Sequence, residues 1–263
     1  MCGLIIDAAA ANALKLDQRI FKQQALSNLI WALTTVKRPS EKVFGFVANS
    51  IVLSAQNKNN RKDEMLKPQE WSIPLYCLAK TGIASGHEED LFPFVVDLMD
   101  NEPGFLERFK PQELSNTCWA AATILSKRDE TPEGPGSEAA LGILRHGARE
   151  MIRRNGDRYT SQELSNTAWS MATLGFGSAG DSAKYFKNLA NSYTKLPSDD
   201  PDGDRALMQA CLEVCKRKAN ERINAFKSQE LNNICWALAR LDEKDEEFLA
   251  IIGKELLNPL LRI

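Results

Sequence analysis

Four lysines recur at one position of a repeated phrase, and their chemistry is that of anion binding. They are Lys22, Lys67, Lys110 and Lys227. Each is expected at the start of a helix, where unpaired backbone N–H groups and the helix dipole also attract anions. A row of such positions can hold the phosphates of a nucleic-acid backbone. The alternative interpretation is a set of solvated lysines that precede a turn.

Asparagines recur six residues after this position of the phrase, which is a threonine in the fourth copy, at Asn28, Asn116, Asn166 and Asn233. Amide groups can pair with the edges of bases, and some helical-repeat proteins read one base per repeat. The interpretation that we favour from sequence alone is a buried amide that ties its helix to the neighbouring repeat. The next residue varies among copies, and the Thr117 and Thr167 hydroxyls are candidates for base contact there. A position that tolerates different packing residues would vary in the same way.

Two further residue types fall at regular spacing. Tryptophans follow the asparagines by three residues and can stack on bases, but among alanines on a helix they are predicted to be core: Trp31, Trp119, Trp169 and Trp236.

Three arginines are spaced by four, which places them on one helix face: Arg145, Arg149 and Arg153. They form either a second basic patch or a solvated outer face. The cluster Lys216, Arg217, Lys218 and Arg222 allows the same two interpretations.

Other chemistry is poorly supported. Cys211 and Cys215 are one helical turn apart, but no third and fourth ligand lies nearby in the sequence, so no metal site is expected. Cys118 and Cys235 share an apolar repeat position, and core packing accounts for them. The 263 residues show no catalytic constellation and no phosphate-binding glycine loop, so we predict neither an enzyme nor a cofactor. Net charge is −2, and no apolar run has the length of a membrane span.

The elements that must position these residues are helices. The phrase, fullest at 109–120, also starts at residues 21, 66, 159 and 226. Proline or serine at the expected first helical position and glutamate in the first turn indicate helix starts, and Thr160 with Glu163 fits a capping box. Apolar residues after each start follow helical spacing. Second helices are predicted near 39–56, 88–100, 137–154 and 204–223, and a further one near 180–195.

Self-similarity at a period of a few tens of residues is typical of solenoids. We therefore predict an all-α fold over 1–263: a right-handed superhelical solenoid of about five helix-pair repeats. The repeats are expected at 21–65, 66–108, 109–158, 159–225 (with an insertion near 177–203) and 226–263, after a trailing half-repeat at 1–20. Both ends of the chain are apolar, which predicts either a piece of a longer solenoid or a solenoid whose ends contact protein subunits.

The phrase Phe-Lys-Pro-Gln-Glu-Leu-Ser-Asn-Thr-Cys-Trp-Ala at 109–120 resembles the octotricopeptide and heptatricopeptide repeats. These helical repeats are found in organelle proteins, often with a RAP domain, and similar proteins serve as chloroplast translation factors and in mitochondrial RNA stability. The resemblance implies paired helices stacked in a superhelix that binds single-stranded RNA on its inner surface. It also implies a chloroplast or mitochondrial location, although no transit peptide is visible and a cytoplasmic location stays open.

From these observations we expect a chain that binds single-stranded organelle RNA and supports translation, processing or stability of a transcript. The alternative is a protein–protein interaction scaffold within a larger assembly, possibly a ribonucleoprotein. No membrane association is expected.

Overall fold

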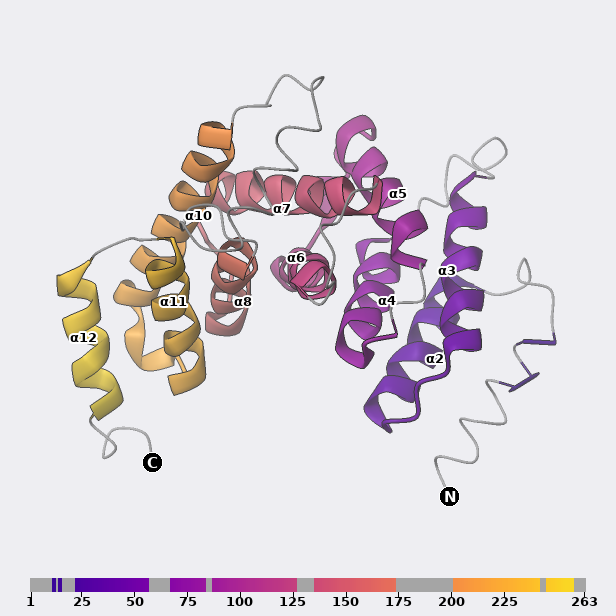
Figure 1. The fold of residues 1–263 in the computed structure, drawn as a ribbon, viewed down its shortest axis with the longest axis horizontal. Helices are drawn as coiled ribbons and strands as arrows, with labels where there is room; N and C mark the ends of the chain where they lie inside the picture. Colours follow the sequence, from indigo (N-terminus) through magenta and orange to yellow (C-terminus); the bar gives the residue numbers. More distant parts are fainter. Residues whose placement is uncertain are drawn as a thin grey trace. The chain divides into compact units, whose positions relative to one another are not determined.

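The computed structural model describes residues 11–12, 14–15, 22–56, 67–83, 87–126, 135–173, 201–241 and 245–257. Over these ranges the chain forms α-helices and two short 3₁₀ turns, without a strand (Figure 1). The predicted all-α class is therefore confirmed. The right-handed superhelix stays a prediction. The predicted helix near 180–195 and nearly all of the half-repeat at 1–20 lie outside the described residues, as do 177–200 of the predicted insertion and the apolar end at 258–263.

The helices gather into two compact units. The first comprises residues 1–124 and 134–143, and the second comprises 125–133 and 144–263. Five helices carry the repeated phrase and are called the motif helices: α2 (Gln23–Thr35), α4 (Pro68–Thr81), α6 (Pro111–Ser126), α8 (Ser161–Thr173) and α11 (Ser228–Arg240). The second helices are α3 (Glu41–Gln56), α5 (His87–Asn101), α7 (Pro135–Arg153), α10 (Pro201–Glu221) and α12 (Glu246–Leu257).

In the first unit, motif helices α2 and α4 pack side by side, and α3 contacts both of them as well as α5 (Figure 1). In the second unit, α8 and α11 pack side by side, and α10 contacts both. In each unit two neighbouring motif helices thus pack together, and a second helix contacts both of them. The predicted bounds of α3, α5, α7 and α10 lie within three residues of those observed.

Glutamate in the first turn fixes four of the five motif-helix starts. The backbone N–H groups of Lys67, Lys110, Thr160 and Lys227 donate to the glutamate three residues later, at 2.7–2.8 Å. At Thr160 the exchange is reciprocal, because the Glu163 N–H donates to Thr160 Oγ1 at 3.3 Å. This confirms the predicted capping box. In α2 the equivalent residue is Ala25, which has no carboxylate to offer.

An aromatic residue anchors the chain just before the starts of three motif helices. Phe109, Tyr159 and Phe226 are buried, at 2%, 1% and 3% exposure. Two of these anchors follow 3₁₀ turns that the sequence did not predict, η3 (Leu106–Arg108) and η4 (Ile223–Ala225). The anchor and the buried leucine five residues later, such as Leu114, occupy the positions of a hydrophobic staple. The staple fixes the direction in which each motif helix leaves its turn.

Candidate nucleic-acid interface

Each motif helix turns one polar and aromatic line of side chains away from the core. In α6 the line is Gln112, Asn116 and Trp119, which are exposed or half-buried and spaced by four and three residues. We call these positions the amide–tryptophan stripe. Its other members are Gln24, Asn28 and Trp31 in α2; Gln69, Ile73 and Tyr76 in α4; Gln162, Asn166 and Trp169 in α8; and Gln229, Asn233 and Trp236 in α11.

The glutamines and Tyr76 were missed by the sequence analysis as candidate binding residues. A signal for both was present. Glutamine occurs in all five copies of the phrase, four residues before the asparagine position, and Tyr76 stands where the other copies have tryptophan. Residues four apart on a helix lie on one face. Projecting the phrase onto a helix would therefore have put the amides and the aromatic rings on the same surface.

The prediction that the motif tryptophans are core residues is wrong for Trp31 and Trp236, which are 53% and 42% exposed. Trp119 and Trp169 are half-buried. The physical reason is the close approach of the motif helices. Where α8 faces α11 it carries small residues, Ser165, Ala168 and Ala172, each at most 1% exposed. A spacing set by such residues leaves no room for an indole between the helices, so the ring lies at the edge of the contact.

Aromatic rings of neighbouring motif helices meet within each unit. In the first unit the ring centroids of Tyr76 and Trp119 are 5.2 Å apart, and Lys80 Nζ lies 5.3 Å from the Tyr76 ring centroid. In the second unit Trp169 and Trp236 stack with centroids 6.3 Å apart. Both separations lie in the range of favourable ring pairs. The pairing holds the rings at the surface, where Trp236 is 42% exposed.

The motif asparagines divide between the two roles considered for them. Asn233 Nδ2 donates to Ser165 Oγ at 3.2 Å, which ties α11 to α8 and confirms the inter-repeat role for this copy. Asn28 is exposed and Asn116 and Asn166 are half-buried, so none of these is the buried amide that was predicted.

Thr117 and Thr167, the candidate base contacts beside the asparagines, have at most 2% exposure. Their Oγ1 atoms donate to the carbonyl oxygens of Glu113 and Glu163, at 2.8 Å in both cases. In this structure their hydroxyls are satisfied within their own helices and are out of reach of a ligand. Packing is the interpretation that fits, because the next copy places an apolar Ile234 at this position.

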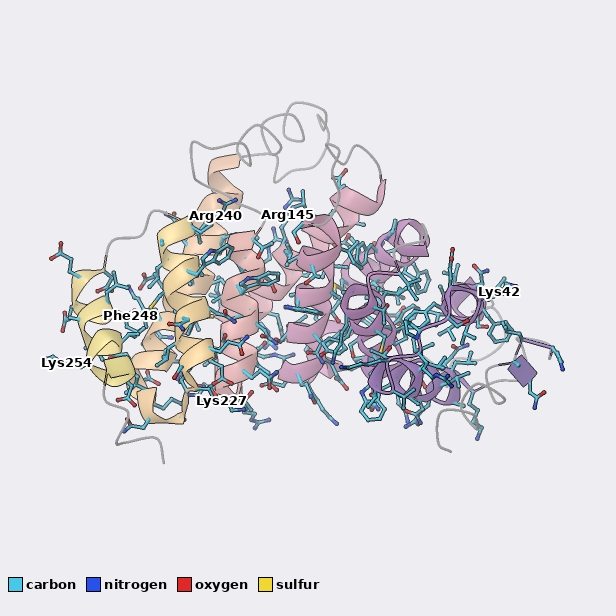
Figure 2. The ribbon with its side chains drawn as sticks, turned by 60° about the horizontal axis from the view of Figure 1, so that its bottom comes forward. Lys42, Arg145, Lys227, Arg240, Phe248 and Lys254 are labelled. Carbon is cyan, nitrogen blue, oxygen red and sulfur yellow. The ribbon has the colours of Figure 1, made fainter. Side chains whose placement is uncertain are left out.

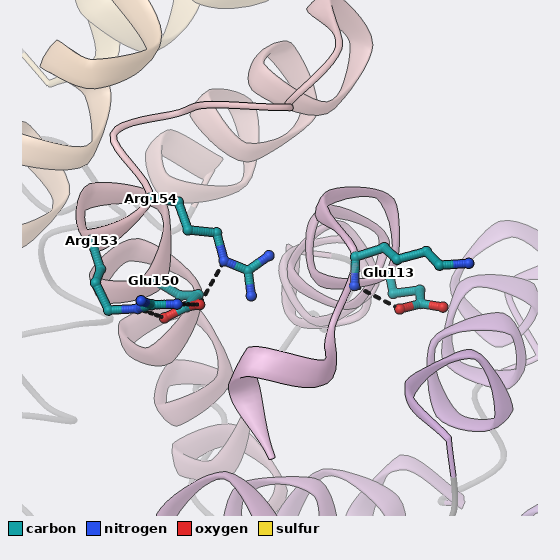
Figure 3. A network of polar contacts seen from close by, with 5 residues as sticks. Glu113, Glu150, Arg153 and Arg154 are labelled. Atoms are coloured by element: carbon teal, nitrogen blue, oxygen red, sulfur yellow. Dashed lines mark hydrogen bonds and ion pairs between the residues drawn. The ribbon is translucent and has the colours of Figure 1, made fainter. Parts of the chain in front are cut away.

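The four lysines at the helix starts are all exposed. Three of them precede a first-turn glutamate whose carboxylate already accepts the backbone N–H of the lysine (Figure 3 shows Glu113). This carboxylate occupies the positive end of the helix. The predicted contribution of the helix ends to phosphate binding is therefore removed at Lys67, Lys110 and Lys227, and the ammonium groups are left to make the contact. Figure 2 shows Lys227 at one end of α11 and Arg240 at the other.

Arg153 belongs to a structural cluster. Glu150 is 4% exposed. Its carboxylate accepts from Arg153 Nε at 2.7 Å and from Arg154 Nε at 2.6 Å (Figure 3). Burial would raise the pKa of Glu150, but hydrogen bonds from Arg153 and then Arg154 outweigh it and hold the pKa below its ordinary value. The predicted patch on α7 thereby loses Arg153. Arg149 is exposed, whereas Arg145 is half-buried and also has a partner.

The basic cluster on α10 is also engaged in the fold. Lys216 Nζ lies 2.8 Å from Asp245 Oδ2 at the start of α12, and Lys218 Nζ lies 3.0 Å from Asp157 Oδ1. Arg222 Nη2 donates to the Tyr159 carbonyl oxygen at 2.6 Å. These contacts join α10 to the turn before α8 and to α12. The cluster is neither the free basic patch nor the simple solvated face that the spacing suggested.

Other candidate sites gain no support within the described ranges. No group of three or more His, Cys, Asp or Glu side chains there could hold a metal ion. Cys211 and Cys215 are fully buried, and burial raises the pKa of the Cys118 thiol to about 12. Core packing is thus confirmed for Cys118, whereas Cys235 is only half-buried. None of the helices in the described segments is long and apolar enough to cross a membrane.

Neither a protein-family model nor a curated protein matches the chain.

Proposed function

We propose that the chain binds single-stranded RNA, with bases against the amide–tryptophan stripe and phosphates near the lysines at the helix starts. The observation that carries the proposal is the exposure of the motif tryptophans, 53% for Trp31 and 42% for Trp236, beside amides on the same helix face. Rings and amides are the two side-chain types that recognise unpaired bases, by stacking and by hydrogen bonding to base edges.

Single strands fit this surface better than duplexes. Stacking on an indole requires a base whose flat face is accessible, and in a duplex that face is covered by the neighbouring base pairs. The chain is also slightly acidic overall, with a net charge of −2. General attraction to polyanions is therefore weak, and binding has to come from local groups such as the lysine row.

The cellular role that we propose follows the resemblance to octotricopeptide and heptatricopeptide repeats. It is support of translation, processing or stability of a chloroplast or mitochondrial transcript. A scaffold that binds only proteins is the competing function, and it predicts no affinity for RNA.

The test is a binding titration with a randomised pool of fluorescent single-stranded RNA. We compare the intact chain with the double variant Trp31→Ala/Trp236→Ala. Base–aromatic stacking contributes about 1–3 kcal/mol per base, so the double variant should bind at least about tenfold more weakly. Both rings are already largely exposed, so the fold should tolerate their removal.

The matched control is Leu53→Ala/Leu249→Ala. Each of these leucines is 43% exposed and lies on a second helix, α3 or α12. The control should bind RNA like the unchanged chain. Absence of binding by the folded, unchanged chain would reject the proposal, and an equal loss in the control would show that the tryptophans have no special role.

A further inference from the structure

One face of motif helix α8 is closed by the next motif helix. Ser165, Ala168 and Ala172 form this face and have exposures of 1%, 0% and 0%. Helix α11 packs against α8, and the hydrogen bond from Asn233 Nδ2 to Ser165 Oγ crosses the contact. The face is made of small side chains, which let the two helices approach closely.

The same face of α11 is open. The residues equivalent to Ser165, Ala168 and Ala172 in the repeated phrase are Asn232, Cys235 and Ala239. Asn232 and Ala239 are exposed and Cys235 is half-buried. This explains why Cys235 is more exposed than Cys118 at the same repeat position. Helix α11 thus repeats the face by which α8 binds its neighbour, and in the described part of the chain no motif helix covers it.

The opposite kind of face is partly exposed on α2 in the described part of the chain. Asn233 contacts α8, and the buried residues near it on α11 include Glu230, Ile234 and Ala237, with exposures of 8%, 0% and 0%. Their equivalents in α2 are Ala25, which is exposed, and Leu29 and Ala32, which are half-buried. Helix α2 therefore presents an uncharged, small and apolar version of the surface that covers α8.

We propose that the open face of α11 binds helix α2 of a second copy of this chain, in the register of the α8–α11 contact. In that register Asn28 of one copy meets Asn232 of the other, where Asn233 and Ser165 meet within the chain. Paired side-chain amides can each donate and accept a hydrogen bond. Neither face carries a charged residue at these positions, so no buried charge opposes the contact.

The contact joins two different surfaces, so it is heterologous, and each copy retains one free surface after binding another. Association should therefore be concentration-dependent and need not stop at a dimer. Asn28 belongs both to this contact and to the stripe, but the tests below use no nucleic acid, so their outcome does not depend on RNA binding.

The test uses two variants of the full chain, each with one face blocked. Ala239→Glu places a carboxylate on the face of α11, and Ala32→Glu places one on the face of α2. We measure mass by sedimentation velocity over a concentration series. The unchanged chain should exceed the mass of one chain as concentration rises, and each variant alone should remain monomeric.

Mixing the two variants gives the sharpest result. The Ala239→Glu variant retains its α2 face, and the Ala32→Glu variant retains its α11 face. An equimolar mixture should therefore form a one-to-one dimer and nothing larger. Asn28→Arg, at an exposed position, replaces Ala32→Glu if that variant fails to fold. Ala210→Glu, at an exposed alanine of α10, is the control and should associate like the unchanged chain. A monomeric unchanged chain, or a mixture that stays monomeric, would overturn the proposal.

Discussion

The lysines that start the motif helices and the basic residues of α7 and α10 carry the same charge in different surroundings. Lys22, Lys67, Lys110 and Lys227 are exposed, and within the described part of the chain no ion pair engages them. On the second helices, Arg153 and Arg154 hold the buried Glu150, and Lys216 and Lys218 pair with Asp245 and Asp157. The first group is available to a ligand, and the second group holds the fold together.

The difference teaches that clustering of charge is a poor guide to a binding surface. The α7 and α10 clusters are denser in sequence than the lysine row, yet their residues are engaged in the fold. Arg153 and Arg154 pair with Glu150 about one turn earlier, and two lysines of α10 also pair with distant acids. Asp157 lies 61 residues from Lys218 in the chain. The lysines of the row are separated by whole repeats, and the first-turn glutamates of α4, α6 and α11 bond to backbone N–H groups and leave the ammonium groups free of that contact.

The largest effect that we expect comes from removing the lysine row. Replacement of Lys22, Lys67, Lys110 and Lys227 by alanine should weaken binding to single-stranded RNA by more than about tenfold at low salt. Each phosphate contact contributes about −0.7 to the slope of log K against log salt for single strands. Loss of four contacts should therefore flatten the slope by about 3, which a salt series measured by fluorescence anisotropy would detect.

The control for the lysine row removes the same amount of charge elsewhere. Lys15, Lys42, Arg217 and Lys254 are exposed and lie outside the motif helices (Figure 2 labels Lys42 and Lys254). Their replacement by alanine should change the salt slope much less. Equal slopes in the two variants would mean that net charge alone governs binding, and the distinction between the two groups would fail.

A smaller effect, on stability, is expected from Glu150→Gln. The change removes a nearly buried carboxylate from two arginines, and hydrogen bonds to charged groups contribute about 1.5–3 kcal/mol. We expect the free energy of unfolding to fall by about 2 kcal/mol, measured by urea denaturation at pH 7. Glu213→Gln, whose side chain is 52% exposed beside Lys216, should cost no more than about 0.5 kcal/mol.

The pH dependence of the same variant follows from the lowered pKa of Glu150. A carboxyl whose pKa is lower in the folded state stabilises the fold above its unfolded pKa, about 4.3 for Glu. That stabilisation is lost as pH falls through the folded value. The difference between the unchanged chain and Glu150→Gln should thus be constant from pH 8 to about pH 5.5 and shrink below it. A difference that grew in acid would contradict the assigned role.

The smallest effect concerns Lys216 and Asp245. Asp245 also accepts the Phe248 N–H at 2.9 Å, so Asp245→Ala alone removes a helix cap as well as an ion pair. A double-mutant cycle with Lys216→Ala isolates the pair, and we expect a coupling of about 0.5–1 kcal/mol. Since the pKa of Asp245 is lowered and that of Lys216 is raised, the coupling should persist across neutral pH. A coupling energy of zero would mean that the Lys216–Asp245 ion pair contributes nothing to stability and that Lys216 behaves as a solvated residue.

The sequence was sufficient to locate the helices, but it was insufficient to predict which of their side chains are exposed. Repetition of the phrase, first-turn glutamates and helical spacing located the motif helices and four of the second helices within a few residues. Exposure depends on how closely helices approach, which is set by Ser165, Ala168 and Ala172 rather than by the tryptophan itself. Likewise, nothing local to α7 distinguishes the buried Glu150 from an exposed glutamate. The exposure of the tryptophans and the burial of Glu150 depend on contacts between elements, which spacing within one helix does not encode. The pairing of Arg153 with Glu150, three residues earlier, was within reach of the sequence.

The most direct test of the central claim is to photocrosslink the intact chain to a randomised single-stranded RNA pool and to identify the crosslinked peptides. The account predicts crosslinks concentrated in the motif helices, at the stripe residues of α2 and α11 above all, where Trp31 and Trp236 are most exposed. Crosslinks confined to α7, α10 and α12, or no crosslink from a folded chain that binds the pool only weakly, would contradict it.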